Sequence, residues 1–438
     1  MSADQKTVAA GRERTGIRRV FFIRKNTDNA LILAVLLLVA FGLMMVYTTS
    51  YYTAQLKIGD SSYYLTRQAL ISGGALAFMI VLSLFNYQWL CKFGTWPVYI
   101  ASVVLMALVD FTSLGIEFNG RKRWFGIGGH SIFQPTELVK LALIMVVALL
   151  LTNLKYKIDK LGGVLLVLGV TGVPIFFVFL NNLSSSIILV AIVLVLMTIA
   201  SEHKKKYLAV LLAFLAVVAV AYFLGDWLVD IGLLKRYQLE RIDVWKDPEA
   251  YSLEGGWQVM QGLYAIGSGG FFGKGLGNSV QKLGFVPEAQ NDMVFSILVE
   301  ELGIFGAICL IALFGFLIYR ILVIASNAPD RLGFFLCAGV AVHISLQVVL
   351  NIAVVTNMIP NTGVTLPFIS YGGSSVLFLM SEFGLVLSVA RQSVGISRKK
   401  RSLLRSLFGS GRRPEAAGQR DAGQAKKRYE QASKADNT

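Results

Sequence analysis

Ten apolar runs, each long enough to cross a lipid bilayer, constrain the fold of this chain more than any other feature. A membrane-spanning helix needs about 20 mostly apolar residues, because the hydrocarbon core is about 30 Å thick. Only 15% of the residues are charged, against about 25% in soluble domains. The sequence therefore predicts an all-α integral membrane protein with about ten transmembrane helices. The runs cover approximately residues 29–49, 68–86, 93–110, 134–152, 161–180, 183–201, 206–224, 292–320, 331–355 and 370–391.

Lysine and arginine gather at particular ends of these runs and predict the orientation. Basic residues precede the first run and follow the fourth, sixth and tenth runs, and ten spans place them all on one side. The positive-inside rule makes that side cytoplasmic. Both termini are then inside: a basic segment over 1–28 and a basic, largely disordered tail over 392–438 flank a membrane domain over 29–391. The segment 111–133 and a large loop over about 225–291, between spans seven and eight, are then extracytoplasmic.

The net charge of +15 resides mostly in the two ends of the chain. Basic ends favour contact with the anionic lipids of a cytoplasmic leaflet. A nucleic-acid partner is not expected, because the basic ends show no interleaved aromatic residues and no binding fold.

Two carboxylates stand where the large predicted loop meets the eighth apolar run: Glu288 and Asp292. A carboxylate at a membrane boundary loses hydration, and chains keep such groups mainly where they are used. Asp292 could simply cap the helix that follows it. Glu300 and Glu301 lie about two turns further on, which is too many acids for capping alone. We therefore interpret Asp292 as a candidate general base that acts on a hydroxyl group.

Three consecutive cations, Arg121, Lys122 and Arg123, break the positive-inside pattern in the first predicted outer segment. They could bind lipid headgroups. Alternatively they bind an anionic ligand, since the planar fork of arginine can bond two phosphate oxygens at once.

Glu137 and Lys140 lie three residues apart at the start of the fourth run, directly after Pro135, which favours a helix start. Residues at this spacing share one helical face and can pair. Such a pair is costly inside a membrane unless it faces protein or water. It is therefore either a buried structural ion pair or part of the lining of a polar substrate cavity.

The stretch 267–278 is rich in glycine, which lets a backbone approach a ligand closely. It fails the test for a phosphate-binding P-loop, because Ser268 stands where the first glycine belongs and Gly275 where serine or threonine is needed. We interpret it, together with 255–261, as irregular backbone that shapes a cleft, with Lys274 as a candidate substrate-binding residue. The alternative is an ordinary loop.

The segment 360–375 mixes proline, glycine and hydroxyl residues between two spans. Irregular backbone at membrane depth is tolerated only where protein or a wet cavity covers it. We expect this segment to fold back toward the outer cleft, with Ser370 and Tyr371 as candidate substrate-binding residues. His343, in the preceding span with Gln347 and Asn351 on the same face, is interpreted as part of a satisfied polar stripe rather than as a metal ligand.

Four sequence blocks together resemble one known family. They are Gln-Pro-Thr-Glu-Leu-Val-Lys, Gly-Lys-Gly-Leu-Gly-Asn-Ser, Pro-Glu-Ala-Gln-Asn-Asp and Pro-Phe-Ile-Ser-Tyr-Gly-Gly-Ser-Ser. The family is SEDS (shape, elongation, division and sporulation), the group that contains RodA, FtsW and SpoVE, and the resemblance covers about residues 29–391. Within the family the chain is more similar to the division branch (FtsW) than to the elongation branch (RodA).

The resemblance implies a peptidoglycan glycosyltransferase that polymerises lipid II, a disaccharide-pentapeptide on undecaprenyl diphosphate, in septal cell-wall synthesis. Asp292 matches the essential outer-loop aspartate of the family, and its implied role is base for the 4-hydroxyl of the acceptor sugar. The implied reaction inverts the donor anomeric carbon and expels the lipid diphosphate. Arg121, Lys122 and Arg123 suit that diphosphate, and a divalent cation such as magnesium or manganese could assist.

Further expectations come with the resemblance. Glu137 and Lys140 match a polar pair of the family on the fourth span, and Glu288 joins the substrate-binding candidates. The implied location is the bacterial plasma (inner) membrane with an extracytoplasmic active site. The implied partners are lipid II, a class B penicillin-binding protein (a transpeptidase), other divisome proteins and membrane lipids.

One departure from the family pattern affects these expectations. Many members have Pro-Asp-Leu-Gly-Thr where this chain has Asn181-Asn182-Leu183-Ser184-Ser185. Asn182 is neutral and cannot replace a charged metal ligand or a proton acceptor. This departure keeps a noncatalytic division scaffold open as an alternative to the enzyme. A lipid II flippase is a second alternative, because ten spans and an intramembrane Glu–Lys pair could serve transport. The flippase is less favoured, because the unusual polar motifs cluster on the predicted outer side.

Overall fold

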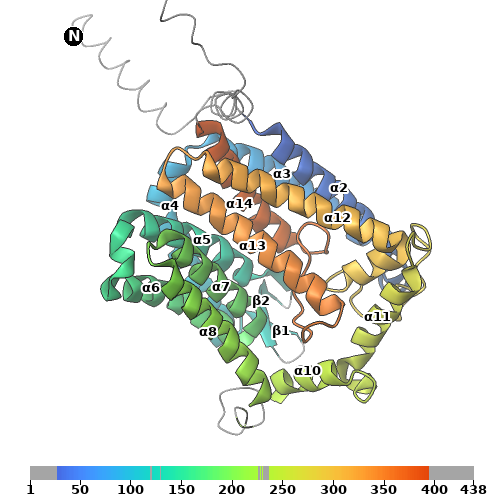
Figure 1. The fold of residues 1–438 in the computed structure, drawn as a ribbon. Coiled ribbons are helices and arrows are strands. Elements are labelled where there is room, and N and C mark those ends of the chain that lie inside the picture. The colour runs from blue at the N-terminus through green and yellow to red at the C-terminus, as the bar shows by residue number, and fades with distance from the viewer. Residues whose placement is uncertain are drawn as a thin grey trace, which may run out of the picture. The chain divides into compact units, whose positions relative to one another are not determined.

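The computed structural model describes residues 27–118, 121–128, 130–224, 227, 229 and 236–393. The predicted terminal segments, 1–28 apart from its last two residues and 392–438 apart from its first two, lie outside these residues. Most of the described chain is helical (Figure 1). The elements in chain order are α2 (Asn29–Ile58), α3 (Tyr63–Leu84), α4 (Tyr87–Phe111), β1 (Gly115–Phe118), β2 (Arg121–Ile127), β3 (His130–Phe133), α5 (Pro135–Leu154), the 3₁₀ helix η1 (Lys155–Asp159), α6 (Leu161–Asn181), α7 (Leu183–Ala200), α8 (Lys204–Phe223), α10 (Arg236–Lys246), the π-helix η2 (Ser252–Gly256), α11 (Trp257–Gly269), α12 (Val294–Ser326), α13 (Arg331–Val355) and α14 (Gly373–Gln392).

The predicted multi-pass membrane fold is confirmed. Among the described residues, nine helices are long and apolar enough to cross a bilayer: α2 to α7 and α12 to α14. They coincide with nine of the ten predicted spans. The remaining prediction, 206–224, falls on α8, which is helical but does not belong to the nine.

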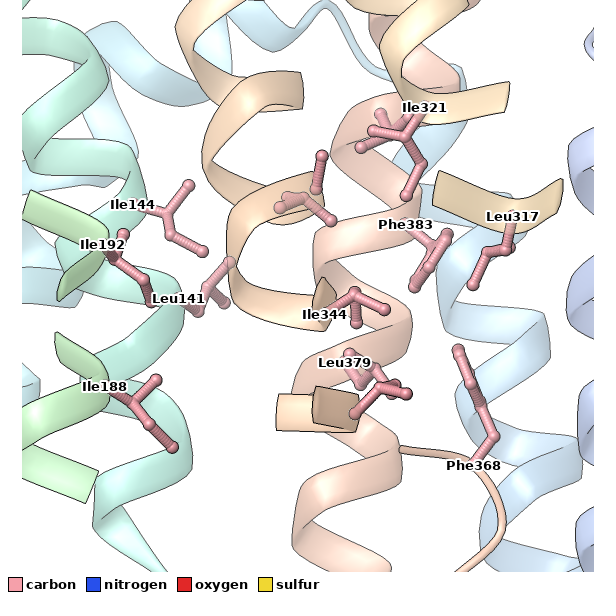
Figure 2. Packing of buried hydrophobic residues seen from close by; sticks show 14 of the residues in the cluster. Leu141, Ile144, Ile188, Ile192, Leu317, Ile321, Ile344, Phe368, Leu379 and Phe383 are labelled. Atoms are coloured by element: carbon pink, nitrogen blue, oxygen red, sulfur yellow. The ribbon is translucent and has the colours of Figure 1, made fainter. Parts of the chain in front are cut away.

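The core of the bundle is built by α5, α13 and α14, which are buried along most of their length. Ile144 of α5, Ile192 of α7, Ile344 of α13 and Phe383 of α14 belong to one cluster of buried apolar side chains (Figure 2). Lipid tails are as apolar as these side chains, so van der Waals packing rather than exclusion from water holds such helices together. The outer helices α3 and α4 expose most of their apolar side chains, as expected of helices that face lipid.

Polar contacts at one end of the bundle place Asp292 at the other. At one end Arg320 of α12 pairs with Asp28, just before α2, and Gln392 at the end of α14 donates a hydrogen bond to Asn86. The two ends of the described membrane domain, near Asp28 and Gln392, lie at the same end of the bundle (Figure 1). Asp292 precedes α12, so it lies at the opposite end from Arg320.

A small antiparallel sheet with the strand order β1-β2-β3 departs from the all-α expectation. It occupies the predicted outer segment between α4 and α5. Ile116 pairs with Trp124, and Phe125 pairs with Phe133, whose rings lie 5.5 Å apart. Aromatic and β-branched residues paired across strands stabilise a sheet. These pairs support the sheet although its strands are short.

The predicted large loop also contains regular structure that the sequence analysis did not assign. Helix α10 lies within it, and α11 contains most of the stretch 255–261, which we had interpreted as irregular backbone. The interpretation was wrong there because Gly255 and Gly256 precede α11, which begins at Trp257. They therefore do not carry the cost of glycine in a helix interior. The segment after Gly269 is irregular, as expected.

Helix α12 is broken at Gly303, whose φ of 70° and ψ of −172° are not helical. A break of this kind separates the amides of Ile304 and Phe305 from the carbonyls of Glu300 and Glu301, their partners in a continuous helix. Four backbone groups would then be left without partners inside the bundle, where each costs free energy.

The loop that follows α11 replaces both lost hydrogen bonds with four new ones. Two loop amides donate to the freed carbonyls, and two loop carbonyls accept from the freed amides, all over 2.9–3.0 Å. The pairs, donor first, are Lys274–Glu300, Gly275–Glu301, Ile304–Gly270 and Phe305–Phe271. The break therefore joins the loop to the helix.

We predict that Gly303→Ala destabilises the protein by on the order of 2–4 kcal/mol. The new Cβ would sit 2.3 Å from the Phe271 carbonyl oxygen at a positive φ. The matched control is Gly315→Ala in the same helix, where a Cβ meets nothing within 4 Å. Thermal unfolding of the purified variants in detergent measures the difference, and equal midpoints for the two would contradict the prediction.

Candidate functional site

Asp292 lies in the last turn of the loop before α12 and is half-buried. It does not cap the helix: α12 begins at Val294, and the N-cap residue is Met293, which makes no side-chain capping bond. Its Oδ1 accepts a 3.3 Å hydrogen bond from Nε2 of Gln258 on α11. Its Oδ2 lies on the side of Gly363, where an added Cβ would be 3.7 Å away.

Asn351 of α13 holds the backbone around Asp292. This side chain is fully buried, and its Nδ2 donates to the carbonyl oxygens of Asp292 at 2.9 Å and Val364 at 2.7 Å. One amide group therefore joins the loop before α12 to the loop before α14. On the same face of α13, Gln347 donates to the Thr365 carbonyl at 3.0 Å.

Gln258 joins Asp292 to two further segments. Its Oε1 accepts from Nδ2 of Asn361 at 3.3 Å, and the Asn361 carbonyl accepts from the Arg241 guanidinium at 2.8 Å. Helices α10 and α11 and the loop before α14 thus converge on one carboxylate. Gln258 is a neutral partner, so it orients the carboxylate without neutralising it.

Burial raises the pKa of Asp292 from 3.8 to about 6, and the nearby charge of Glu288 acts in the same direction. The cation of Arg241 and the hydrogen bond from Gln258 act in the opposite direction. A carboxylate with a pKa of about 6 is mostly ionised at neutral pH, yet it holds a proton more strongly than an ordinary aspartate. These are the properties of an effective general base.

Glu288, a predicted substrate-binding residue, lies close enough to Asp292 to influence it. Its side chain is exposed, and its Oε2 accepts from Nδ2 of Asn291 at 2.6 Å. Its φ of 51° lies in the left-handed region, which is uncommon for a residue other than glycine. The turn so formed exposes the Glu288 carboxylate beside the more buried Asp292.

The loop before α14 reaches the same place, as the sequence predicts. The Tyr371 amide donates to the Gln290 carbonyl at 2.8 Å, and its ring meets Tyr64 edge-on at 5.1 Å. Ser370 is buried, and its Oγ accepts from the Leu366 amide at 2.8 Å. Tyr371 therefore lies next to the Asp292 loop, whereas the Ser370 hydroxyl stabilises its own turn.

Glu137 and Lys140 form a buried ion pair of 2.8 Å on α5. The Ser375 side chain is also a hydrogen-bonding partner of Glu137, and His343 is close enough to act on its charge. His343 in turn contacts Glu382 of α14 at 2.9 Å. The pairing expected from the sequence is present, and it belongs to a network of polar and ionisable side chains that joins α5, α13 and α14 in the bundle interior.

The three predicted anion-binding cations lie in β2. Nζ of Lys122 donates to the Thr112 carbonyl at 3.2 Å, and Nε of Arg123 donates to the Asn181 carbonyl at 3.2 Å. For Arg121 the structure describes the backbone but not the side chain. Lys122 and Arg123 thus contact the ends of α4 and α6, beside the sheet.

Lys274, the cation of the glycine-rich stretch, pairs with Glu300 at 2.7 Å. Lys282 pairs with Glu301 at 2.6 Å. Glu300 and Glu301 therefore do not cap the helix but bind the two lysines of the preceding loop. Lys274 keeps 35% of its side chain exposed, so it lies at the surface.

Asn182 has a structural role at the position where the family pattern has aspartate. Its Oδ1 accepts from the Ser185 amide at 3.1 Å and so caps the start of α7. Asparagine and aspartate are about equally good N-caps. The fold therefore tolerates the neutral residue.

A metal site made by the protein alone is not found in the part of the chain that the structure describes: no three His, Cys, Asp or Glu side chains gather there in a metal-binding arrangement. Divalent magnesium and manganese prefer several oxygen ligands. The described His, Cys, Asp and Glu side chains therefore do not fit a resident metal ion.

Three residues around Asp292 were not predicted from the sequence. They are Arg241, Gln258 and Asn351, whose side-chain amide donates to the Asp292 carbonyl. Gln258 and Asn351 stood in segments already singled out, but nothing in their spacing relates them to residue 292. Arg241 lies in α10, whose mixture of charged and aromatic residues could have indicated an amphipathic helix.

The fold and site define a multi-pass helical membrane protein that carries a half-buried carboxylate on the loop leading into a broken helix. Residues 28–395 match the family described as "Cell cycle protein" (FTSW_RODA_SPOVE), and the chain belongs to this family. The resemblance inferred from the four sequence blocks is confirmed.

Relatives and solved structures agree with this assignment. The chain is 35% identical over 375 residues to stage V sporulation protein E of Bacillus subtilis (strain 168), covering 84% of this chain and 98% of that protein. It is 36% identical over 376 residues to the probable peptidoglycan glycosyltransferase FtsW of the same organism, covering 84% and 91%. Its structure is similar to the rod shape determining protein RodA of Thermus thermophilus (TM-score 0.61, 26% identity, 85% and 99% covered). It is also similar to a chain of a peptidoglycan synthase complex that coordinates polymerization and crosslinking (TM-score 0.67, 28% identity, 84% and 99% covered).

We predict that Glu137→Gln destabilises the protein by about 3–5 kcal/mol, because it leaves buried Lys140 without its counter-charge. The double variant Glu137→Gln/Lys140→Met should cost less than the sum of the two single changes. Unfolding of the four proteins in bicelles measures the coupling. The exposed Glu117→Gln serves as control, and strictly additive effects would contradict a functional ion pair.

Proposed function

We propose that this chain is a peptidoglycan glycosyltransferase that polymerises lipid II, with Asp292 as its general base. The observation that carries the proposal is the state of Asp292: half-buried, held on one oxygen by neutral Gln258, and with its pKa raised to about 6. The name of the FtsW relative gives the same activity for that protein. The family membership supports the transfer of that activity to this chain.

The proposed step is a single displacement. Asp292 takes the proton from the 4-hydroxyl of the acceptor sugar while that oxygen attacks C1 of the donor. The bond from C1 to the lipid diphosphate breaks, and the diphosphate leaves with the electron pair. Configuration at C1 inverts, so no covalent intermediate on the enzyme is needed. Oδ2 is suited to receive the proton, since Gln258 holds Oδ1.

The leaving diphosphate needs positive charge nearby. Lys122 and Arg123 in β2 remain the proposed partners together with Arg121, and Arg241 adds a cation on the Asp292 side. A divalent cation, magnesium or manganese, would arrive with the diphosphate as part of the substrate. Polymerisation measured with chelator and with added cation tests this requirement.

The biological setting is proposed from the relatives. Several carry the name of FtsW, which supports a role in septal wall synthesis during division. The similarity to a chain of a complex that both polymerises and crosslinks supports a class B penicillin-binding protein as partner, with other divisome proteins around the pair. The positive-inside pattern supports an inner-membrane location with both termini cytoplasmic and Asp292 outside.

We predict that Asp292→Asn abolishes polymerisation of lipid II, because the amide keeps the shape of the carboxylate but cannot accept the proton. Gel analysis of glycan strands made by the purified protein with its partner measures the loss. The control is Asp247→Asn, an exposed carboxylate in the α10–α11 connection, which should stay active. Normal strands from Asp292→Asn would refute the proposed function.

Two further measurements, one in lipid vesicles and one in cells, separate the enzyme from the two alternatives. Transfer of lipid II across the vesicle membrane without polymerisation would favour a flippase. Normal cell division with Asp292→Asn would favour a scaffold.

We predict that kcat rises with pH through a midpoint near 6, because Asp292 must lose its proton to act as a base. Glu288→Gln removes a charge that raises this pKa, so the midpoint should move to lower pH. Arg241→Gln removes a cation that lowers it, so the midpoint should move to higher pH. Shifts of equal sign in the two variants would contradict this assignment of the charges.

A further inference from the structure

The Glu300 carboxylate is an unusual acceptor, because it is fully buried and is bonded by groups from several residues of the preceding loop. A buried charge requires such compensation. Nζ of Lys274 lies at 2.7 Å, the Val280 amide at 3.2 Å and the Gln281 amide at 3.3 Å, and the Ser279 hydroxyl makes a short bond. One carboxylate of α12 thus fixes the loop over 274–281.

The neighbouring Glu301 makes a second attachment. It pairs with Lys282 at 2.6 Å, and the two side chains are 0% and 1% exposed. The Lys282 ammonium also lies over the ring of Tyr51 on α2, 5.1 Å from its centroid. Removing two charges from water is costly and is recovered only by close geometry. A pair buried to this degree is therefore expected to hold its position.

These attachments fix the loop before Asp292 to the first segment of α12, which follows Asp292. From Lys282 the loop returns to Asp292 over ten residues, with internal hydrogen bonds from Val286 to Gln281 and from Asn291 to Glu288. The first segment of α12 then leads from Val294 back to Glu300 and Glu301. Asp292 is thus reached from both directions by segments that are fixed at the same two carboxylates.

We propose that Lys282, Glu300 and Glu301 form a positioning clamp that fixes the place and the partial burial of the Asp292 carboxylate. The clamp, so defined, includes no group that touches the reacting atoms. The proposal rests on the proposed role of Asp292 as base. Its physical basis is that misplacing a catalytic group by about 1 Å can cost on the order of a hundredfold in rate.

The clamp should affect the pKa of Asp292 as well as its position. If it loosens, the loop moves away from α12 and water reaches the Asp292 carboxylate. Hydration removes the main cause that raises the pKa of Asp292, which is burial. The base should then be weaker as well as misplaced, and the acid side of the pH–rate profile should move to lower pH.

The test uses Lys282→Met in the full chain with its partner, with Lys57→Met as the control, an exposed lysine at the end of α2. We expect faster hydrogen exchange confined to 270–293, a fall of kcat on the order of a hundredfold, and a pH midpoint below that of the wild type. The neutral double variant Lys282→Met/Glu301→Leu, which leaves no buried charge unpaired, should recover part of the rate. Glu300→Gln, which keeps the shape of the acceptor, repeats the test if Lys282→Met does not fold.

The results separate this proposal from the one on which it rests. An unchanged exchange pattern, an unchanged kcat or an unmoved pH midpoint in folded Lys282→Met would overturn the clamp. Polymerisation by Asp292→Asn, measured alongside, would instead overturn the role of Asp292.

Discussion

The exchange of hydrogen bonds at Gly303 is the interaction on which the arrangement of the site depends. A helix in an apolar bundle can break only if its freed amides and carbonyls find other partners. The loop after α11 supplies all four, through Gly270, Phe271, Lys274 and Gly275. The same contacts bring the rest of that loop, and Asp292 at its end, against the first segment of α12. Without the break, the loop would have no backbone groups of α12 to bind.

The acids at this end of α12 are of similar chemistry, and their partners give them different roles. Glu301 is fully buried against the cation Lys282, so its charge is already neutralised and no substrate can reach it. Asp292 is half-buried, and its side chain accepts a hydrogen bond from the neutral amide of Gln258. It therefore combines a raised pKa with access. Of Glu301 and Asp292, only Asp292 can still accept a proton from a ligand.

The sequence predicted the spans and the place of Asp292, because apolar length and a carboxylate at a span boundary are local signals. It did not predict the break, since α12 reads as one apolar run and the loop that fills the gap at Gly303 lies about thirty residues earlier. The ion partners of Glu300 and Glu301 were missed for the same reason. The sheet had a local signal, the dipeptide Asn119-Gly120 between two short runs, which is typical of hairpins.

The neutral Asn182 shows how the fold can lose a family charge at this end of the bundle without losing its geometry. The side chain caps α7 as an aspartate would. Next to it, Nδ2 of Asn181 donates to Oδ1 of Asp110 at 2.5 Å. A carboxylate is therefore still present within one residue of the altered position, now supplied by the end of α4. Since Asp292 receives its hydrogen bond from Gln258 of α11 and its backbone support from Asn351 of α13, none of the contacts that define its state passes through Asn182.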